Sequence, residues 1–177
     1  MHINVNDEVI EPYWNDEVVE TEMAAIRARL AEWLVYDDEV AEPVSGELIK
    51  LGLCLNRATV TQSTDTTESI ESREERTLLQ GRLSWHFSDA ANALEWFVVD
   101  MKGYRICFEL LSSTVARSYE VGNQIRVEGD AYVLGGYQYQ DWSIPDIRAE
   151  WRVLSATRPS ETSSSYTLQL QAARRPL

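Results

Sequence analysis

The chain has 177 residues, of which 44% are hydrophobic and 10% aromatic, so it holds enough apolar material for one folded domain and is not a wholly disordered polypeptide. Its formal charge of −13 arises in residues 1–75, where 18 Asp and Glu stand against 5 Lys and Arg, while residues 76–177 carry 11 of each sign. An acidic chain repels nucleic acid at long range, which excludes wholesale coating of DNA but leaves room for a local basic face.

Neither a transmembrane helix nor a metal or disulfide framework is expected. No run approaches 18 apolar residues, and the polar residues 1–16 lack the pattern of a secretory signal. Two cysteines, Cys54 and Cys107, and two histidines are too few for a disulfide scaffold or a usual zinc site. We therefore expect a cytoplasmic protein without membrane contact and without a cofactor or metal.

An acidic arm followed by one helix is expected over residues 1–45. Residues 1–20 alternate acids with short apolar pieces and keep no single period, which predicts an extended arm. Residues 18–36 have apolar side chains at helical spacing and predict an amphipathic helix, whose stripe comprises Met23, Ile26, Leu30, Trp33 and Leu34. This stripe either packs on the main domain or binds a protein partner, and the arm could dock on a basic groove of this chain or of a partner.

Residues 46–75 predict one strand and a loop. The segment 47–61 begins with an apolar run on both parities, which is typical of a strand buried on both faces. Residues 61–75 are rich in Ser, Thr and Glu with a single large hydrophobe, Ile70, and predict a linker or loop.

Five strands are expected over residues 76–157, and residues 158–177 are expected to form a low-complexity tail in which 166–171 could add an edge strand. The strands are predicted at 78–87, 94–100, 104–111, 124–134 and 146–154. Met101-Lys102-Gly103 predicts a tight turn between the second and third, and a short helix fits between the third and fourth. In the first strand one parity is expected to face inward, and it comprises Leu79, Gly81, Leu83, Trp85 and Phe87.

This order of strands resembles that of the OB-fold, a five-stranded Greek-key barrel. The segments LLQGRLSWHF, EWFVVDMKGYRICFEL, YEVGNQIRVEGDAYV and IPDIRAEWRVLSATRP are similar to OB-fold domains of the single-stranded-DNA-binding and anticodon-binding type, over somewhat less than half of the chain. The characteristic positions would fall on Gly81, Asp100, Gly103, Gly122, Val127 and Gly129. The resemblance implies a mainly β fold with a barrel, to which the acidic, helix-containing N-terminal region is added.

The resemblance also implies a surface for single-stranded nucleic acid, built from aromatic faces that stack on bases and arginines that contact phosphates. The expected stacking residues are Tyr137, Tyr139 and Trp142 in the loop 135–145, with Trp96 and Tyr104 beside them. The expected phosphate contacts are Arg82, Arg105, Arg126, Arg148 and Arg152. The alternatives are that the loop aromatics close the end of the barrel and that the arginines pair with Glu109, Glu128 and Glu150.

No catalytic motif is recognised, so the leading hypothesis is a non-enzymatic protein that binds single-stranded nucleic acid, with DNA as the first choice. In this hypothesis the acidic arm competes for the basic face or recruits a partner. The alternative is a protein-interaction subunit without nucleic-acid binding, including the case in which its acidic surface mimics DNA. The oligomeric state stays open.

Overall fold

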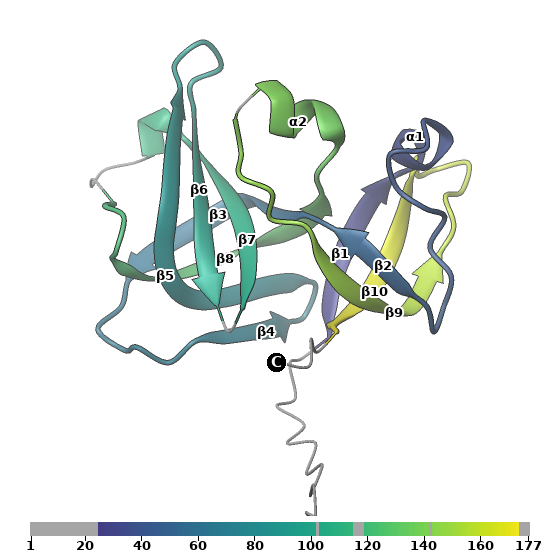
Figure 1. The fold of residues 1–177 in the computed structure, drawn as a ribbon, viewed down its shortest axis with the longest axis horizontal. Coiled ribbons are helices and arrows are strands. Elements are labelled where there is room, and N and C mark those ends of the chain that lie inside the picture. The colour runs from purple at the N-terminus through teal and green to yellow at the C-terminus, as the bar shows by residue number, and fades with distance from the viewer. Residues whose placement is uncertain (1–24, 102, 115–118, 142, 174–177) are drawn as a thin grey trace, which may run out of the picture.

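The computed structural model describes residues 25–173, except for residues 102, 115–118 and 142, and this part of the chain is mainly β (Figure 1). The elements in chain order are β1 (Ile26–Ala31), α1 (Glu32–Tyr36), β2 (Leu48–Leu51), β3 (Leu53–Gln62), β4 (Ser69–Arg73), β5 (Arg76–Asp89), β6 (Leu94–Met101), β7 (Tyr104–Leu111), the 3-10 helix η1 (Ser112–Thr114), β8 (Gln124–Val133), α2 (Gly136–Asp141), β9 (Ala149–Thr157) and β10 (Ser165–Ala172). The acidic arm, Met23 and Trp142 lie outside the described residues.

Five of these strands close into a β-barrel, seen on the left of Figure 1. β5 pairs with β6 and β6 with β7, while β8 pairs with both β5 and β3, all in antiparallel fashion. The circle is completed by a parallel pairing of β3 with β7. The strands β5, β6, β7 and β8, with η1 between the last two, follow in the expected order, and the whole is consistent with an OB-fold-like barrel.

The prediction that residues 146–154 form the fifth strand of the barrel is wrong. β3 takes that position, between β7 and β8. β3 precedes the other four strands in the chain, so the barrel has the expected neighbours in a circularly permuted order. β3 begins with an unbroken apolar run because both of its faces are buried there. Leu53 and Leu55 face the barrel core, whereas Cys54 is buried on the outer side. β9 does alternate inward and outward side chains as expected, but it lines a different part of the core.

Four of the remaining strands form an extension in the order β2-β9-β10-β1, on the right of Figure 1. The fifth, β4, pairs with β5 at the other end of the sheet, so the expected loop at 61–75 is wrong where it contains this strand. β1 joins it to the barrel by a short parallel pairing with β8, in which Ala28 lies opposite Ala131. β10 lies between β9 and β1 and buries Tyr166, Leu168 and Leu170. The expected low-complexity tail therefore contains an interior strand of the sheet.

Within the described residues, the prediction of a helix over 18–36 is wrong except at α1. Residues 26–31 are a strand paired with β10 along its full length, and only α1 is helical. Ile26 and Leu30 fit both a helical spacing of four and a strand spacing of two, and pairing with a distant segment decides between them. With Ala28 between them, both side chains are buried at the strand period.

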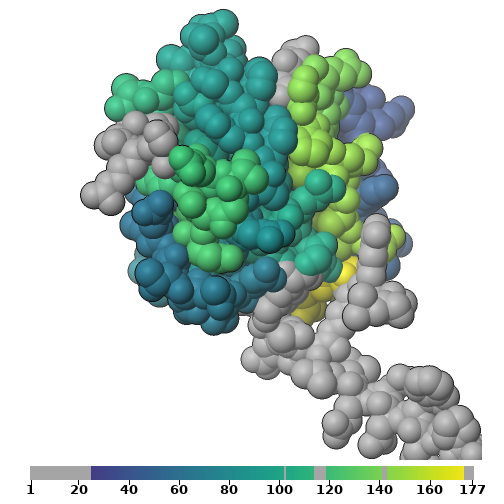
Figure 2. Space-filling view, turned by 60° about the vertical axis from the view of Figure 1, so that its left-hand side comes forward, coloured from purple at the N-terminus to yellow at the C-terminus, as the bar shows by residue number. Residues whose placement is uncertain are grey.

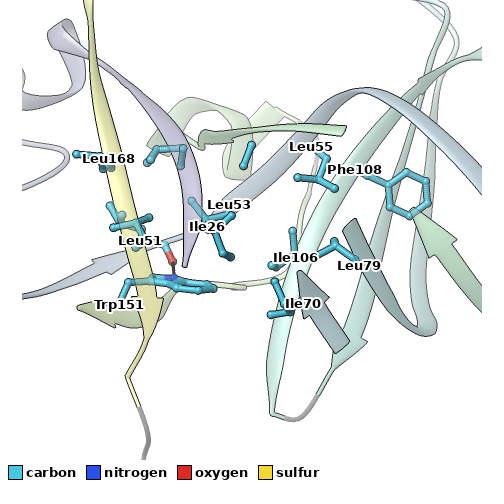
Figure 3. Packing of buried hydrophobic residues seen from close by; sticks show 14 of the residues in the cluster. Ile26, Leu51, Leu53, Leu55, Ile70, Leu79, Ile106, Phe108, Trp151 and Leu168 are labelled. Carbon is cyan, nitrogen blue, oxygen red and sulfur yellow. Dashed lines mark hydrogen bonds between the residues drawn. The ribbon is translucent and has the colours of Figure 1, made fainter. Parts of the chain in front are cut away.

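One continuous core runs through the barrel and the extension (Figure 3). Trp151 and Leu51 from the extension lie on one side of it, and Ile106 and Leu79 from the barrel lie on the other. The indole Nε1–H of Trp151 donates to the carbonyl oxygen of Leu51 at 3.3 Å. Because the two parts share one apolar interior, we expect them to unfold together.

Candidate nucleic-acid interface

The outer wall of the barrel carries a second, smaller apolar cluster. Cross-strand pairing sets Trp85 opposite Val98, and Val98 opposite Cys107, in one outward-facing row. The segment that follows β8 lies over this row, and Leu134, Ile144 and Ile147 join the cluster. Figure 2 shows this segment in yellow-green against the teal strands β5 and β6. The chain thus covers part of the outer wall of its own barrel.

Of the loop aromatics expected to stack on bases, the two described tyrosines, Tyr137 and Tyr139, lie in different surroundings. Tyr139 turns toward the wall, packs against the second cluster and reaches Gly52 with its hydroxyl, and its burial raises the pKa of this phenol. The guanidinium of Arg148 lies 5.7 Å from the centre of the Tyr139 ring. Tyr137 is exposed and lies near Trp33 instead. Of the two loop tyrosines, Tyr137 is thus the more exposed.

Of the two other expected stacking residues, Trp96 is buried and Tyr104 is half-buried against the core. Trp96 is only 1% exposed and lies in the second cluster. The Tyr104 ring lies 5.2 Å from that of Trp151, and its hydroxyl donates to the carbonyl oxygen of Ala173. Their positions suit the packing of the barrel rather than contact with a base.

A β-bulge places Trp85 and Phe87 on the outer wall of the barrel, which the sequence pattern does not predict; we call this aromatic pair the ledge. The register of β5 on β6 shifts between Leu83 and Trp85. The prediction that Trp85 and Phe87 face inward with Leu83 is therefore wrong. Trp85 and Phe87 point to the outer wall and are half-buried, with ring centroids 6.0 Å apart and planes 13° from parallel. His86 takes the other side, where it stacks on Phe97 at 4.5 Å. The consecutive bulky rings at 85–87 are the only sequence signal, since they cannot all face one side of a strand.

Two of the expected arginines lie in the adjacent row of the wall. Arg82 and Arg105 lie opposite Asp100 on the two neighbouring strands, and both are exposed. Arg82 makes no ion pair with any residue that the structure describes, and Arg105 donates to the backbone oxygen of Asp146 at 2.8 Å. One carboxylate oxygen of Asp100 is buried without a hydrogen-bond partner among the described residues. This row therefore keeps two cationic groups at the surface.

The three remaining arginines do not extend this row into a stripe. Arg126 is exposed on β8, where its neighbours across the strands are Gln80 and Thr61. Arg152 lies in the extension and donates to the carbonyl oxygen of Gly46 at 3.0 Å. The expected pairing of arginines with Glu128 is found, but through a different arginine, Arg76, at 3.6 Å.

Arg148 is engaged in a bidentate pair with Asp146, with bonds of 2.8 and 2.9 Å. The hydrogen bonds from Arg148 lower the pKa of the Asp146 carboxyl to about 2. Because this folded-state pKa is depressed, the pair contributes stability above the ordinary pKa of an aspartate, and the contribution is lost as the pH falls toward 2. We expect a carboxyl titration followed by NMR to place Asp146 near 2, and the substitution Arg148→Gln to return it toward the ordinary value.

A normal Asp146 pKa in the unchanged protein would contradict this pairing. Asp65 offers a matched control, since backbone and side-chain hydrogen bonds around Thr67 lower its pKa at a remote loop. The pKa of Asp65 should not respond to the change at Arg148.

Comparison with known proteins finds no relative: no protein family matches the chain, and neither a curated protein nor a solved structure does. In the described part of the chain no three His, Cys, Asp or Glu side chains are placed to hold a metal ion. The helices that the structure describes are all too short or too polar to cross a bilayer. The function must therefore be argued from the geometry of the outer wall.

Proposed function

We propose that this protein is a non-enzymatic, OB-fold-like binding protein for single-stranded nucleic acid, with DNA as the first choice. The observation that carries the proposal is the Trp85–Phe87 ledge, a pair of stacked, half-buried rings on the outer wall of the barrel. A base laid on such a ring gains about 1–3 kcal/mol, whatever its identity, because every base has a π face.

Two cationic groups, Arg82 and Arg105, lie in the row of the wall next to this ledge. Adjacent strands lie about 4.8 Å apart, so the backbones of these residues, on either side of β6, are separated by about 10 Å. The ledge begins one row further along β5. A nucleotide that stacks on Trp85 thus has its phosphate within reach of an arginine.

The covering segment limits how much strand the wall accepts. Leu134, Ile144 and Ile147 are buried against the wall, while Trp85 and Phe87 on β5 stay partly exposed. We therefore infer a short site for one or two stacked bases. The overall charge of −13 opposes binding, so we expect weak affinity that depends on salt.

We expect the double substitution Trp85→Leu and Phe87→Leu to weaken binding of a labelled single strand by about tenfold or more, since it removes two stacking faces. Leucine keeps the apolar contacts with the second cluster, so the fold is retained. The measurement is fluorescence anisotropy with a fluorescein-labelled oligothymidine of about 20 nucleotides at about 50 and 200 mM salt.

The salt series tests the arginines in the same assay. Two phosphate contacts on a single strand predict a loss of affinity of about sevenfold between these salt concentrations, and the double substitution Arg82→Gln and Arg105→Gln should remove most of it. Tyr36→Ala, a change of an exposed aromatic on the other part of the molecule, is the matched control and should leave the affinity unchanged. Equal affinity of the unchanged protein and the leucine variant would exclude the ledge as the site.

A second candidate function is a protein-interaction subunit that does not bind nucleic acid. It is favoured by the exposed aromatic side chains of α1, which stand among acidic residues. Absence of any oligonucleotide binding at micromolar protein and low salt would select this alternative.

A further inference from the structure

A second set of exposed aromatic side chains lies on the two short helices, α1 and α2. Trp33 of α1 and Tyr137 of α2 have ring centroids 5.7 Å apart with planes tilted by 37°. Trp33 is 42% exposed, Tyr137 45% and Tyr36 74%. Figure 1 places both helices at the same end of the molecule, one above the extension and one between the two parts. Large aromatic side chains gathered in this way are typical of surfaces that bind other molecules.

The surroundings of these rings are acidic. Residues 32–42 hold five acids and no Lys or Arg: Glu32, Asp37, Asp38, Glu39 and Glu42. Glu32 accepts a hydrogen bond from the Tyr36 hydroxyl at 2.7 Å, and Glu39 accepts one from the backbone N–H of Gly136 at 2.6 Å. Of these five acids, only Glu42 has an ion-pair partner among the described residues, Arg158 at 2.7 Å. The aromatic surface therefore has a net negative rim.

The negative charge of this surface indicates which kind of molecule can bind to it. Nucleic acid is repelled, and a second copy of the chain would bring the same negative rim against it. Residues 1–24 hold seven acids and no Lys or Arg, so they carry the wrong sign.

We propose that Trp33, Tyr36 and Tyr137, with the carboxylates around them, form a docking surface for an arginine-rich segment of a partner protein. A guanidinium group lies flat on an indole or phenol ring and at the same time donates a fork of hydrogen bonds to a carboxylate. Exposed rings beside Glu32 and Asp37 provide both kinds of partner. The surface shares no residue with the Trp85–Phe87 ledge, so the proposal stands independently of nucleic-acid binding.

The test uses the full chain labelled with 15N and a synthetic octa-arginine peptide as the probe. The indole N–H resonance of Trp33, identified by its loss in Trp33→Phe, is expected to shift until the surface is saturated. The double substitution Trp33→Leu and Tyr137→Leu should weaken binding by about tenfold, the value of two cation–π contacts. A Trp33 resonance that stays in place while the peptide binds would overturn the proposal.

Charge alone attracts an arginine peptide to an acidic protein, so a matched pair of variants separates the surface from the net charge. Asp37→Asn with Asp38→Asn removes two charges beside the rings, and asparagine is compatible with the φ of +56° at Asp38. Glu71→Gln with Glu74→Gln removes two exposed charges from the β4–β5 hairpin. The first pair should weaken binding clearly and the second by less than about twofold, as expected for screened distant charges. Equal weakening by both pairs would show diffuse attraction and overturn the proposal, even if the leucine variant failed to fold.

Discussion

Replacing Trp151 with alanine is expected to lower the free energy of unfolding by about 3–5 kcal/mol, the usual cost of removing a fully buried tryptophan. Trp151 is 1% exposed, packs in the core shared by barrel and extension, and donates its indole N–H to the Leu51 carbonyl. The substitution leaves a cavity in the shared core and removes the indole hydrogen bond to Leu51. Urea denaturation followed by far-UV circular dichroism measures the loss.

Leu154 provides the matched control for this experiment. It lies on the same strand, β9, but is exposed, so Leu154→Ala should change the free energy of unfolding by no more than about 0.5 kcal/mol. The transition of Trp151→Ala should also stay single, because one core holds both parts together. Similar losses for the two variants would mean that barrel and extension do not depend on a common interior.

Gly52→Ala is expected to destabilise the protein by about 1–3 kcal/mol through overpacking, and Tyr139→Phe is expected to relieve most of that loss. A β-carbon at Gly52 would overlap the hydroxyl of Tyr139, with the ring carbon Cζ next at 3.1 Å. The same hydroxyl is buried and has no hydrogen-bond partner among the described residues. Tyr139→Phe alone should therefore be neutral or slightly stabilising, since no bond is lost and a buried polar group disappears.

A double-mutant cycle of these two substitutions measures the contact of the covering segment with the barrel. We expect the double variant to be more stable than the sum of the single changes by about 1–2 kcal/mol, in urea denaturation of all four proteins. Tyr132→Phe, which removes a hydroxyl that donates to Glu109 at 3.3 Å, is the control partner and should show no coupling to Gly52→Ala. Additive effects with Tyr139→Phe would contradict the placement of the segment on the wall.

Local patterns were sufficient for the strands that pair with their neighbours in the chain. The hairpin of β6 and β7 was expected from alternating residues around a glycine turn, and Gly103 has the positive φ of 82° that such a turn requires. The pairing of β5 with β6 also follows from closeness in sequence. All residue pairs in these two ladders lie within 18 positions of each other, so a local sequence pattern can predict them.

The failures involve pairing with distant segments. Nothing near β3 indicates that Cys54 will lie beside Cys107, and nothing near β9 indicates that another strand will close the barrel in its place. The strand β1 looks helical until β10 pairs with it. For the site, a single bulge after Leu83 moves Trp85 to the outer wall and changes which aromatic side chains are open to a ligand.

The early position of β3 sets an order of events for the growing chain on the ribosome. β3 leaves the ribosome before either of its barrel neighbours, β7 and β8, has been made. Its apolar residues therefore stay exposed to solvent until the chain has been synthesised past Val133. β1 waits longer still, because its antiparallel partner β10 ends at Ala172. Pairings that span so much of the chain are slow to form, and a nascent chain in this interval exposes unpaired strand edges. The permuted order thus lengthens the interval in which the chain is exposed to aggregation during its own synthesis.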